Sequence, residues 1–135
     1  MRNKEELNRR MKVFRFFTGW KAEGDLAGIP KSIIIVAPHT SYWDAILGKC
    51  FLMATGTHYN FITKRSFFRF PVKYILRALG FVPVGGIKGH NTINDVCEIM
   101  QNSESRHIVI CPEGGFAPTE RWNPGFYYMA KRAHV

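Results

Sequence analysis

A run of apolar, mostly β-branched residues at positions 32–37 is the feature that most constrains the fold. The run is apolar on both faces, as a strand buried within a parallel sheet must be. Other short apolar runs recur along the chain, separated by stretches with helical periodicity. This alternation predicts an α/β fold, with a mainly parallel sheet and flanking helices. The predicted strands are 32–37, 59–63, 81–84 and 107–111, and the predicted helices after them are 42–54, 71–79, 92–101 and 125–133.

A basic amphipathic helix is predicted for residues 1–18, ahead of an α/β domain at residues 19–135. Its apolar positions recur at helical spacing: Leu7, Met11, Phe14 and Phe17. Lys and Arg supply most of the polar surface. Two environments suit such a helix. It packs on its own domain with a solvated basic face, or it lies on an anionic membrane with Phe side chains at the headgroup boundary.

The net charge of +9 favours anionic partners, which are phosphate groups, an acidic membrane surface or nucleic acid. No nucleic-acid motif accompanies the charge, so we expect no nucleic-acid partner. The three cysteines form no C-x-x-C pair, so we expect no disulfide framework, no metal site and a reducing compartment. The apolar run at 33–37 is far shorter than the ~20 residues of a spanning helix. We expect a cytoplasmic protein, free or peripheral on the inner face of the membrane.

Two loops carry reactive residues at the carboxyl ends of predicted strands, where parallel α/β sheets place their sites. The loop at 37–44 contains His39 and, five residues later, Asp44. A carboxylate in the first turn of the next helix can orient an imidazole, whose second nitrogen is then available as a general base. The alternative is structural, because Ser41 and Asp44 also form a capping-box pattern. The second loop, 111–115, contains Glu113 and two glycines.

Three motifs resemble the glycerophospholipid acyltransferase family, which includes the lysophosphatidic acid acyltransferases. They are residues 39–44 (His-Thr-Ser-Tyr-Trp-Asp), 80–84 (Gly-Phe-Val-Pro-Val) and 112–114 (Pro-Glu-Gly), in the family's order and spacing. Residues 122–130 look like a soluble bacterial branch of the family. The resemblance covers about residues 14–135.

The resemblance implies acyl transfer from a thioester of coenzyme A or acyl carrier protein to a hydroxyl of a lysophospholipid or related acceptor. It implies no cofactor beyond this acyl donor. His39 would be the general base and Asp44 its orienting partner. Glu113 and Gly114 would help to bind the acceptor head group, and Lys64 matches a lysine of the family branch at a strand end.

An acyl-transfer site also needs donors for a tetrahedral oxyanion. The backbone amides of Gly85 and Gly86, or of Gly114 and Gly115, are the candidates, because glycine lets the backbone approach a substrate closely. The alternative is that these glycines only form turns.

Three features depart from the family pattern. Gly86 and Phe116 stand where the family usually has arginines that grip a phosphate. Lys88 and Arg121 lie nearby in the sequence as possible substitutes. The family's fourth motif would follow the last residue given, so we expect either a fragment or a sheet that lacks a final strand. These departures support a rival hypothesis, in which a weakened or inactive acyltransferase fold binds anionic lipid through its basic surface.

Overall fold

The predicted strands form one sheet in which each strand runs parallel to its neighbours. The computed structural model describes residues 4–21, 23, 28–56, 58–86, 88, 91–115 and 117–135, without the side chains of Lys4, Leu7 and Tyr42. Within these residues the sheet has four strands in the order β1-β4-β2-β3, which confirms the predicted α/β class. The strands are β1 (Lys31–Ile35), β2 (Tyr59–Lys64), β3 (Phe81–Val84) and β4 (Arg106–Ile110).

The chain divides into two compact units. The first contains residues 1–29 and 41–58, with helices α1 (Lys4–Thr18) and α2 (Tyr42–Thr55). The second contains residues 30–40 and 59–135, and it includes the whole sheet. Its helices are the 3₁₀ helix η1 (Arg65–Phe67), α3 (Val72–Ala78), α4 (Thr92–Gln101) and α5 (Gly125–Ala133).

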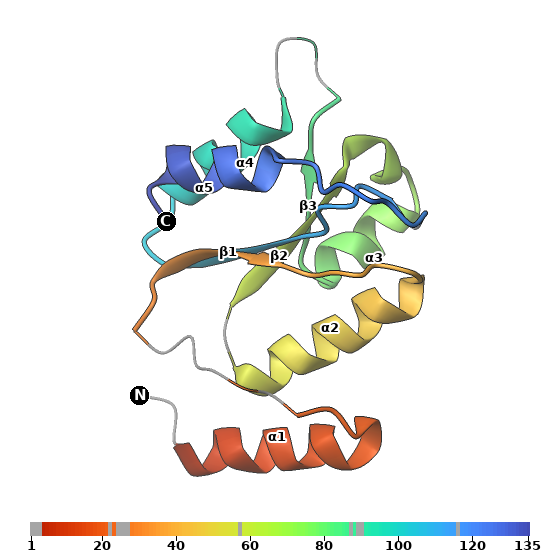
Figure 1. Ribbon diagram of the computed structural model, residues 1–135, viewed down its shortest axis with the longest axis vertical. Helices are drawn as coiled ribbons and strands as arrows, with labels where there is room; N and C mark the ends of the chain where they lie inside the picture. The colour runs from red at the N-terminus through yellow and green to blue at the C-terminus, as the bar shows by residue number, and fades with distance from the viewer. Residues whose placement is uncertain are drawn as a thin grey trace. The chain divides into compact units, whose positions relative to one another are not determined.

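The core of the second unit lies between the sheet and helices α4 and α5, which cover one sheet face together (Figure 1). Ile108 at the centre of β4 is fully buried, as are Val96 and Met100 of α4. Met129 of α5 joins the same cluster. Side chains alternate between the two faces of a strand, so Ile33, Ile62 and Val84 also reach this core from the other three strands.

The first unit is held together by contact between α1 and α2. Phe14 of α1 is buried, and its ring centroid lies 5.6 Å from that of Phe51 in α2. Phe17, predicted on the same apolar stripe, is exposed, and so is Phe16, at 84%. The predicted stripe is therefore split between a packed side and an exposed side, and the side chain of Leu7 lies outside the described residues. No helix in the described part of the chain is both long and apolar enough to cross a bilayer.

The predicted bounds of α4 are confirmed, whereas its cap and the start of α3 differ from the prediction. Thr92 and Asp95 have the spacing of a capping box, which predicts Thr92 as the cap, but the cap of α4 is Asn91, whose side chain accepts the Asn94 N–H at 2.8 Å. The Asp95 carboxylate, the other half of that pattern, accepts a hydrogen bond from Gly85 instead. Pro71 precedes the first residue of α3 by one position.

Pro83 lies in the edge strand of the described sheet, as its lack of an N–H predicts. Strand β1 starts one residue earlier and ends two residues earlier than the predicted run. Even so, the Val36 N–H still donates to the Ile110 carbonyl at 2.9 Å. The chain therefore leaves the sheet directly ahead of the His39 loop.

We predict that His107 makes the folded state sensitive to acid. This side chain is 3% exposed, and its Nδ1 lies 2.7 Å from the Ser32 hydroxyl. Burial lowers the pKa of His107 below the ordinary value of 6.5. Below pH 6.5 the unfolded chain therefore binds more protons at this position than the folded chain does. The free energy of unfolding, measured with urea, is expected to fall as the pH drops through this window.

The His107→Gln variant removes the titrating ring and keeps a polar group opposite Ser32. Its free energy of unfolding is expected to change less between pH 7.5 and pH 5.5 than that of the parent protein. His58→Gln, at an exposed position, is the matched control and should keep the parent profile. An unchanged pH profile in His107→Gln would contradict the assignment.

Candidate active site

The site begins where β1 and β4 end side by side. These strands pair in parallel, with Ile35 opposite Ile110. The loops that leave their carboxyl ends therefore emerge next to each other. The backbone N–H of His39 donates to Oε2 of Glu113 at 2.6 Å, across 74 positions of sequence. The loops of the first and third sequence motifs are thus joined by a hydrogen bond to a carboxylate, a stronger class of bond than a neutral one.

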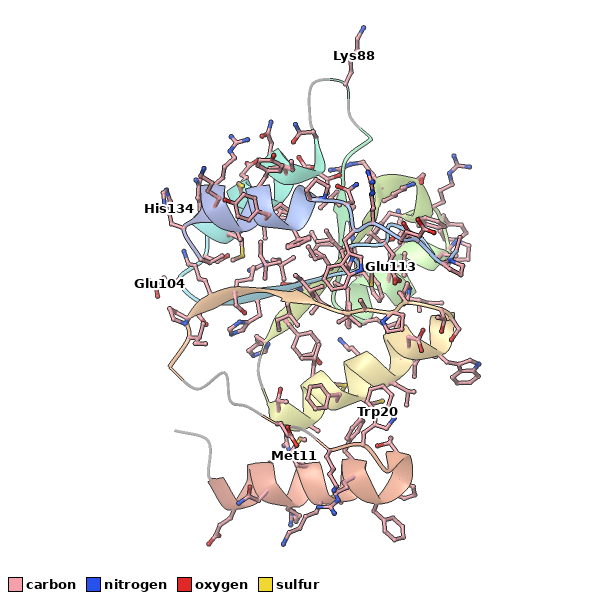
Figure 2. The ribbon with its side chains drawn as sticks, viewed as in Figure 1. Met11, Trp20, Lys88, Glu104, Glu113 and His134 are labelled. Carbon is pink, nitrogen blue, oxygen red and sulfur yellow. The ribbon has the colours of Figure 1, made fainter. Side chains whose placement is uncertain are left out.

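The hydrogen bond to Glu113 restrains the backbone that carries the His39 imidazole. Both side chains are half-buried, and the Nδ1 atom of His39 is buried. Figure 2 shows Glu113 and Glu104 toward opposite ends of β4, with Glu113 at the carboxyl end. This is the end of the sheet at which parallel α/β folds place their chemistry.

Asp44 belongs to the first unit and lies in the opening turn of α2. Its Oδ2 accepts the Ser41 N–H at 2.8 Å, so the capping alternative applies to this oxygen. An ionised carboxylate has two oxygens and about four acceptor positions, so capping does not use up its capacity. His39 belongs to the second unit, and its pairing with Asp44 stays a prediction.

The turn after β3 is held from both sides. The Gly85 N–H donates to Oδ2 of Asp95 at 2.6 Å, and the Gly85 carbonyl accepts from Nε of Arg65 at 3.2 Å. Gly85 and Gly86 both have left-handed backbones, with φ of 64° and 79°. A Cβ on Gly85 would stand 3.1 Å from Oγ1 of Thr92. Glycine is therefore required here, and the Gly85 N–H already serves the fold, so Gly86 is the member of this pair that we keep as an oxyanion candidate.

The second glycine pair follows β4 directly. Gly114 donates its N–H to the Cys111 carbonyl at 3.2 Å, which closes a tight turn around Glu113. Gly114 and Gly115 are both exposed. The Asn123 N–H donates to the Pro112 carbonyl at 2.9 Å, which ties the segment ahead of α5 to the same turn. Both glycines remain candidates for contact with a substrate.

The basic residues predicted to bind a substrate lie in different parts of the second unit. Lys64 is exposed at the carboxyl end of β2, opposite Val84. Arg121 is exposed, and its backbone exchanges two hydrogen bonds with the Thr119 hydroxyl. Lys88 is exposed, and Figure 2 shows it projecting away from Glu113. Phe116 lies outside the described residues.

No three His, Cys, Asp or Glu side chains gather into a possible metal site among the residues that the structure describes. The groups at the carboxyl ends of β1 and β4 suit acid-base and hydrogen-bonding chemistry. They are the His39 imidazole, the Glu113 carboxylate that accepts the His39 backbone N–H, and the exposed glycines Gly114 and Gly115.

The family model described as Acyltransferase matches residues 4–135. The chain belongs to the acyltransferase family. The searches of curated proteins and of solved structures gave no match. Members of this family move an acyl group from a donor to a hydroxyl acceptor. The substrates of this acyltransferase are therefore an acyl donor and an acceptor with a hydroxyl group.

Two residues of this acyltransferase that support the site are not predicted by the sequence motifs. Asp95 and Arg65 both act on the backbone of Gly85, from α4 and from η1. The only signal for Asp95 was its place in an apparent capping pattern. Arg65 had no signal beyond its position next to Lys64. A hydrogen bond to a backbone group far along the chain produces no pattern in the spacing of neighbouring residues in the sequence.

We predict that Asp95→Asn destabilises the fold. The substitution replaces the carboxylate that accepts the Gly85 N–H by a neutral amide, which forms a weaker bond. The expected loss in the free energy of unfolding is about 1–2 kcal/mol. Urea denaturation measures it. Glu98→Gln, on the exposed side of the same helix, is the matched control and should change stability by less than about 0.5 kcal/mol. Equal stability of Asp95→Asn and the parent would contradict the prediction.

Proposed function

We propose that this acyltransferase moves a fatty acyl group from a thioester of coenzyme A or acyl carrier protein to a hydroxyl of a lysophospholipid or related acceptor. The observation that carries the proposal is the hydrogen bond from the His39 backbone to Glu113. It supports a site in which the first and third motifs act together at one edge of the sheet. Donor and acceptor classes come from the resemblance of these motifs to the glycerophospholipid acyltransferases.

In the proposed reaction His39 is the general base. Because Nδ1 is buried, we assign the reacting position to Nε2. This nitrogen takes the proton of the acceptor hydroxyl as the hydroxyl oxygen attacks the thioester carbonyl carbon. A carbon–oxygen bond forms, and the carbonyl oxygen becomes an oxyanion. When the carbon–sulfur bond breaks, the sulfur leaves as a thiol with the proton returned by the imidazolium, and an ester remains.

The other residues have supporting roles in this proposal. Asp44 orients the imidazole through a carboxylate that also caps α2. The N–H groups of Gly86 and Gly115 are the candidate donors to the oxyanion, where one such donor is typically worth about 3 kcal/mol of barrier. Glu113 holds the His39 backbone, and with Gly114, Lys64 and Arg121 it faces the acceptor. Lys88 is the weakest of these assignments, because it projects away from Glu113.

The acceptor head group is the open part of the proposal. Gly86 cannot supply the bidentate grip that an arginine offers a phosphate. A panel that contains lysophosphatidic acid and lysolipids without a phosphate monoester therefore tests the acceptor class directly. Release of free thiol from acyl-CoA gives the rate, and the mass of the product identifies the acceptor.

His39→Ala is expected to lower the acylation rate about 10²–10⁴-fold, because it removes the proposed base. Thiol release with the best acceptor of the panel measures the loss. His58→Ala, at an exposed histidine, is the control and should retain the parent rate. Asp44→Asn should also be slow, although its amide oxygen can still accept the Ser41 N–H and keep α2 capped. A fully active His39→Ala would refute the mechanism and favour the lipid-binding module.

Glu113 is expected to affect both stability and rate through the His39 backbone. Glu113→Gln keeps a neutral acceptor for the His39 N–H, whereas Glu113→Ala leaves that N–H without one. The expected destabilisation is about 1–3 kcal/mol for alanine and less for glutamine. The acylation rates should fall in the same order. Glu120→Ala, an exposed acid in the same connection, is the control. Parent-like stability and rate in Glu113→Ala would contradict the role.

A further inference from the structure

The connection between β2 and β3 exposes an unusual number of large apolar side chains. None of the residues of η1 or α3, all of which the structure describes, is buried. Phe70 is 78% exposed and Ile75 is 61% exposed. We call this connection, residues 65–79, the 65–79 surface. Its exposed large apolar side chains are Phe67, Phe70, Val72, Tyr74, Ile75 and Leu79. The surfaces of soluble proteins rarely expose so many apolar side chains in one region unless that region binds a partner or a ligand.

Basic residues are interleaved with these apolar side chains. Arg69, Lys73 and Arg77 recur every fourth residue, and Arg69 and Arg77 are exposed. Nζ of Lys73 lies 5.0 Å from the centroid of the Tyr74 ring, and that ring meets Phe70 edge-on with centroids 6.2 Å apart. Cationic heads therefore stand beside aromatic rings on one short segment. This arrangement suits an interface in which rings enter an apolar layer and ammonium or guanidinium groups meet anions.

Charge complementarity identifies the occupant. Residues 45–94 contain seven Lys or Arg and no Asp or Glu, so most of the net charge of +9 arises in this stretch. Helix α1 is also basic and also exposes phenylalanines, but its five Lys or Arg are partly balanced by Glu5 and Glu6, and Glu6 pairs with Arg10. An apolar layer covered by negative charge is what an anionic lipid bilayer presents.

The 65–79 surface is also coupled to the site edge of its own unit. It begins directly after Lys64, at the carboxyl end of β2, and Nε of Arg65 donates to the Gly85 carbonyl after β3. A bilayer bound here would lie next to the strand ends that hold His39 and Glu113. We propose that the 65–79 surface docks this acyltransferase on anionic lipid bilayers. The benefit for catalysis rests on the proposed lipid acceptor, whereas the docking itself does not.

Sedimentation with lipid vesicles tests the docking without any acyl donor. Vesicles of phosphatidylcholine alone are compared with vesicles that also contain phosphatidylglycerol. The parent protein should bind the anionic vesicles more tightly and lose binding as salt is raised. The triple variant Arg69→Gln, Lys73→Gln, Arg77→Gln should bind about a hundredfold more weakly, at roughly fivefold for each charge near the surface. Phe70→Ser with Ile75→Ser should weaken binding about tenfold or more.

Two further pairs of substitutions locate the effect. Tyr127→Ser with Tyr128→Ser alters exposed aromatic residues of α5 in the same unit and should leave binding unchanged. Phe16→Ser with Phe17→Ser should retain most of the binding. If the α1 pair abolishes binding while both 65–79 variants bind normally, the proposal is wrong. It is also wrong if the parent fails to bind anionic vesicles, or if Phe70→Ser with Ile75→Ser converts a dimer to a monomer, since a second copy would then cover this surface.

Acyl transfer separates this inference from the proposed function. With a short-chain acceptor dissolved as monomers, the 65–79 variants should match the parent rate. With the acceptor embedded in anionic vesicles, their rates should fall together with binding. If vesicle binding follows the expected pattern but no acceptor is acylated, the docking surface stands and the proposed reaction fails.

Discussion

Pairing between β1 and β4 is the interaction on which the candidate site depends. The two strands are 71 or more positions apart in the chain, yet their register places Ile35 beside Ile110 and lets Val36 continue the ladder for one more bond. Three residues further on, the His39 N–H reaches the Glu113 carboxylate. A one-residue slip of this register would exchange the two faces of β4 and turn Ile108 out of the core. The buried centre of β4 therefore fixes the geometry of the loops at its end.

The strands and most helix positions could be predicted because their signals are local and strong. The run at 32–37 predicted a strand buried on both faces; strand β1 does form there, but it lies at an edge of the described sheet and Ile35 is exposed. Periodicity marked the helices that follow. Helix ends were less predictable, because adjacent polar residues offer competing caps. Asn91 and Thr92 both suit the cap position of α4; Asn91 takes it, and Asp95 accepts the distant Gly85 N–H. Local patterns contain no information about that donor.

The candidate site shows the same division. The proximity of His39 to the 111–115 loop follows from the rule that parallel strands end at one edge of the sheet. The roles of Arg65 and Asp95 did not follow, because both residues act on the backbone of a glycine 10 or 20 positions away. Lys64 and Lys88 are both candidate cationic contacts in the sequence, on different grounds. In space the two differ, since Lys64 is fixed at a strand end and Lys88 projects away from Glu113.

The left-handed backbone at Gly86 makes any charged side chain at this position unfavourable. With φ at 79°, any residue with a Cβ pays a conformational penalty of roughly 1–2 kcal/mol. A Cβ would also come within 3.6 Å of the Arg65 Cβ, an ordinary contact that by itself would be tolerated. The backbone conformation at position 86, and not a lack of space, therefore disfavours arginine there. A guanidinium introduced at position 86 would therefore carry this penalty unless the turn after β3 also changed its conformation, so the side chain at this position and the shape of the loop cannot vary independently.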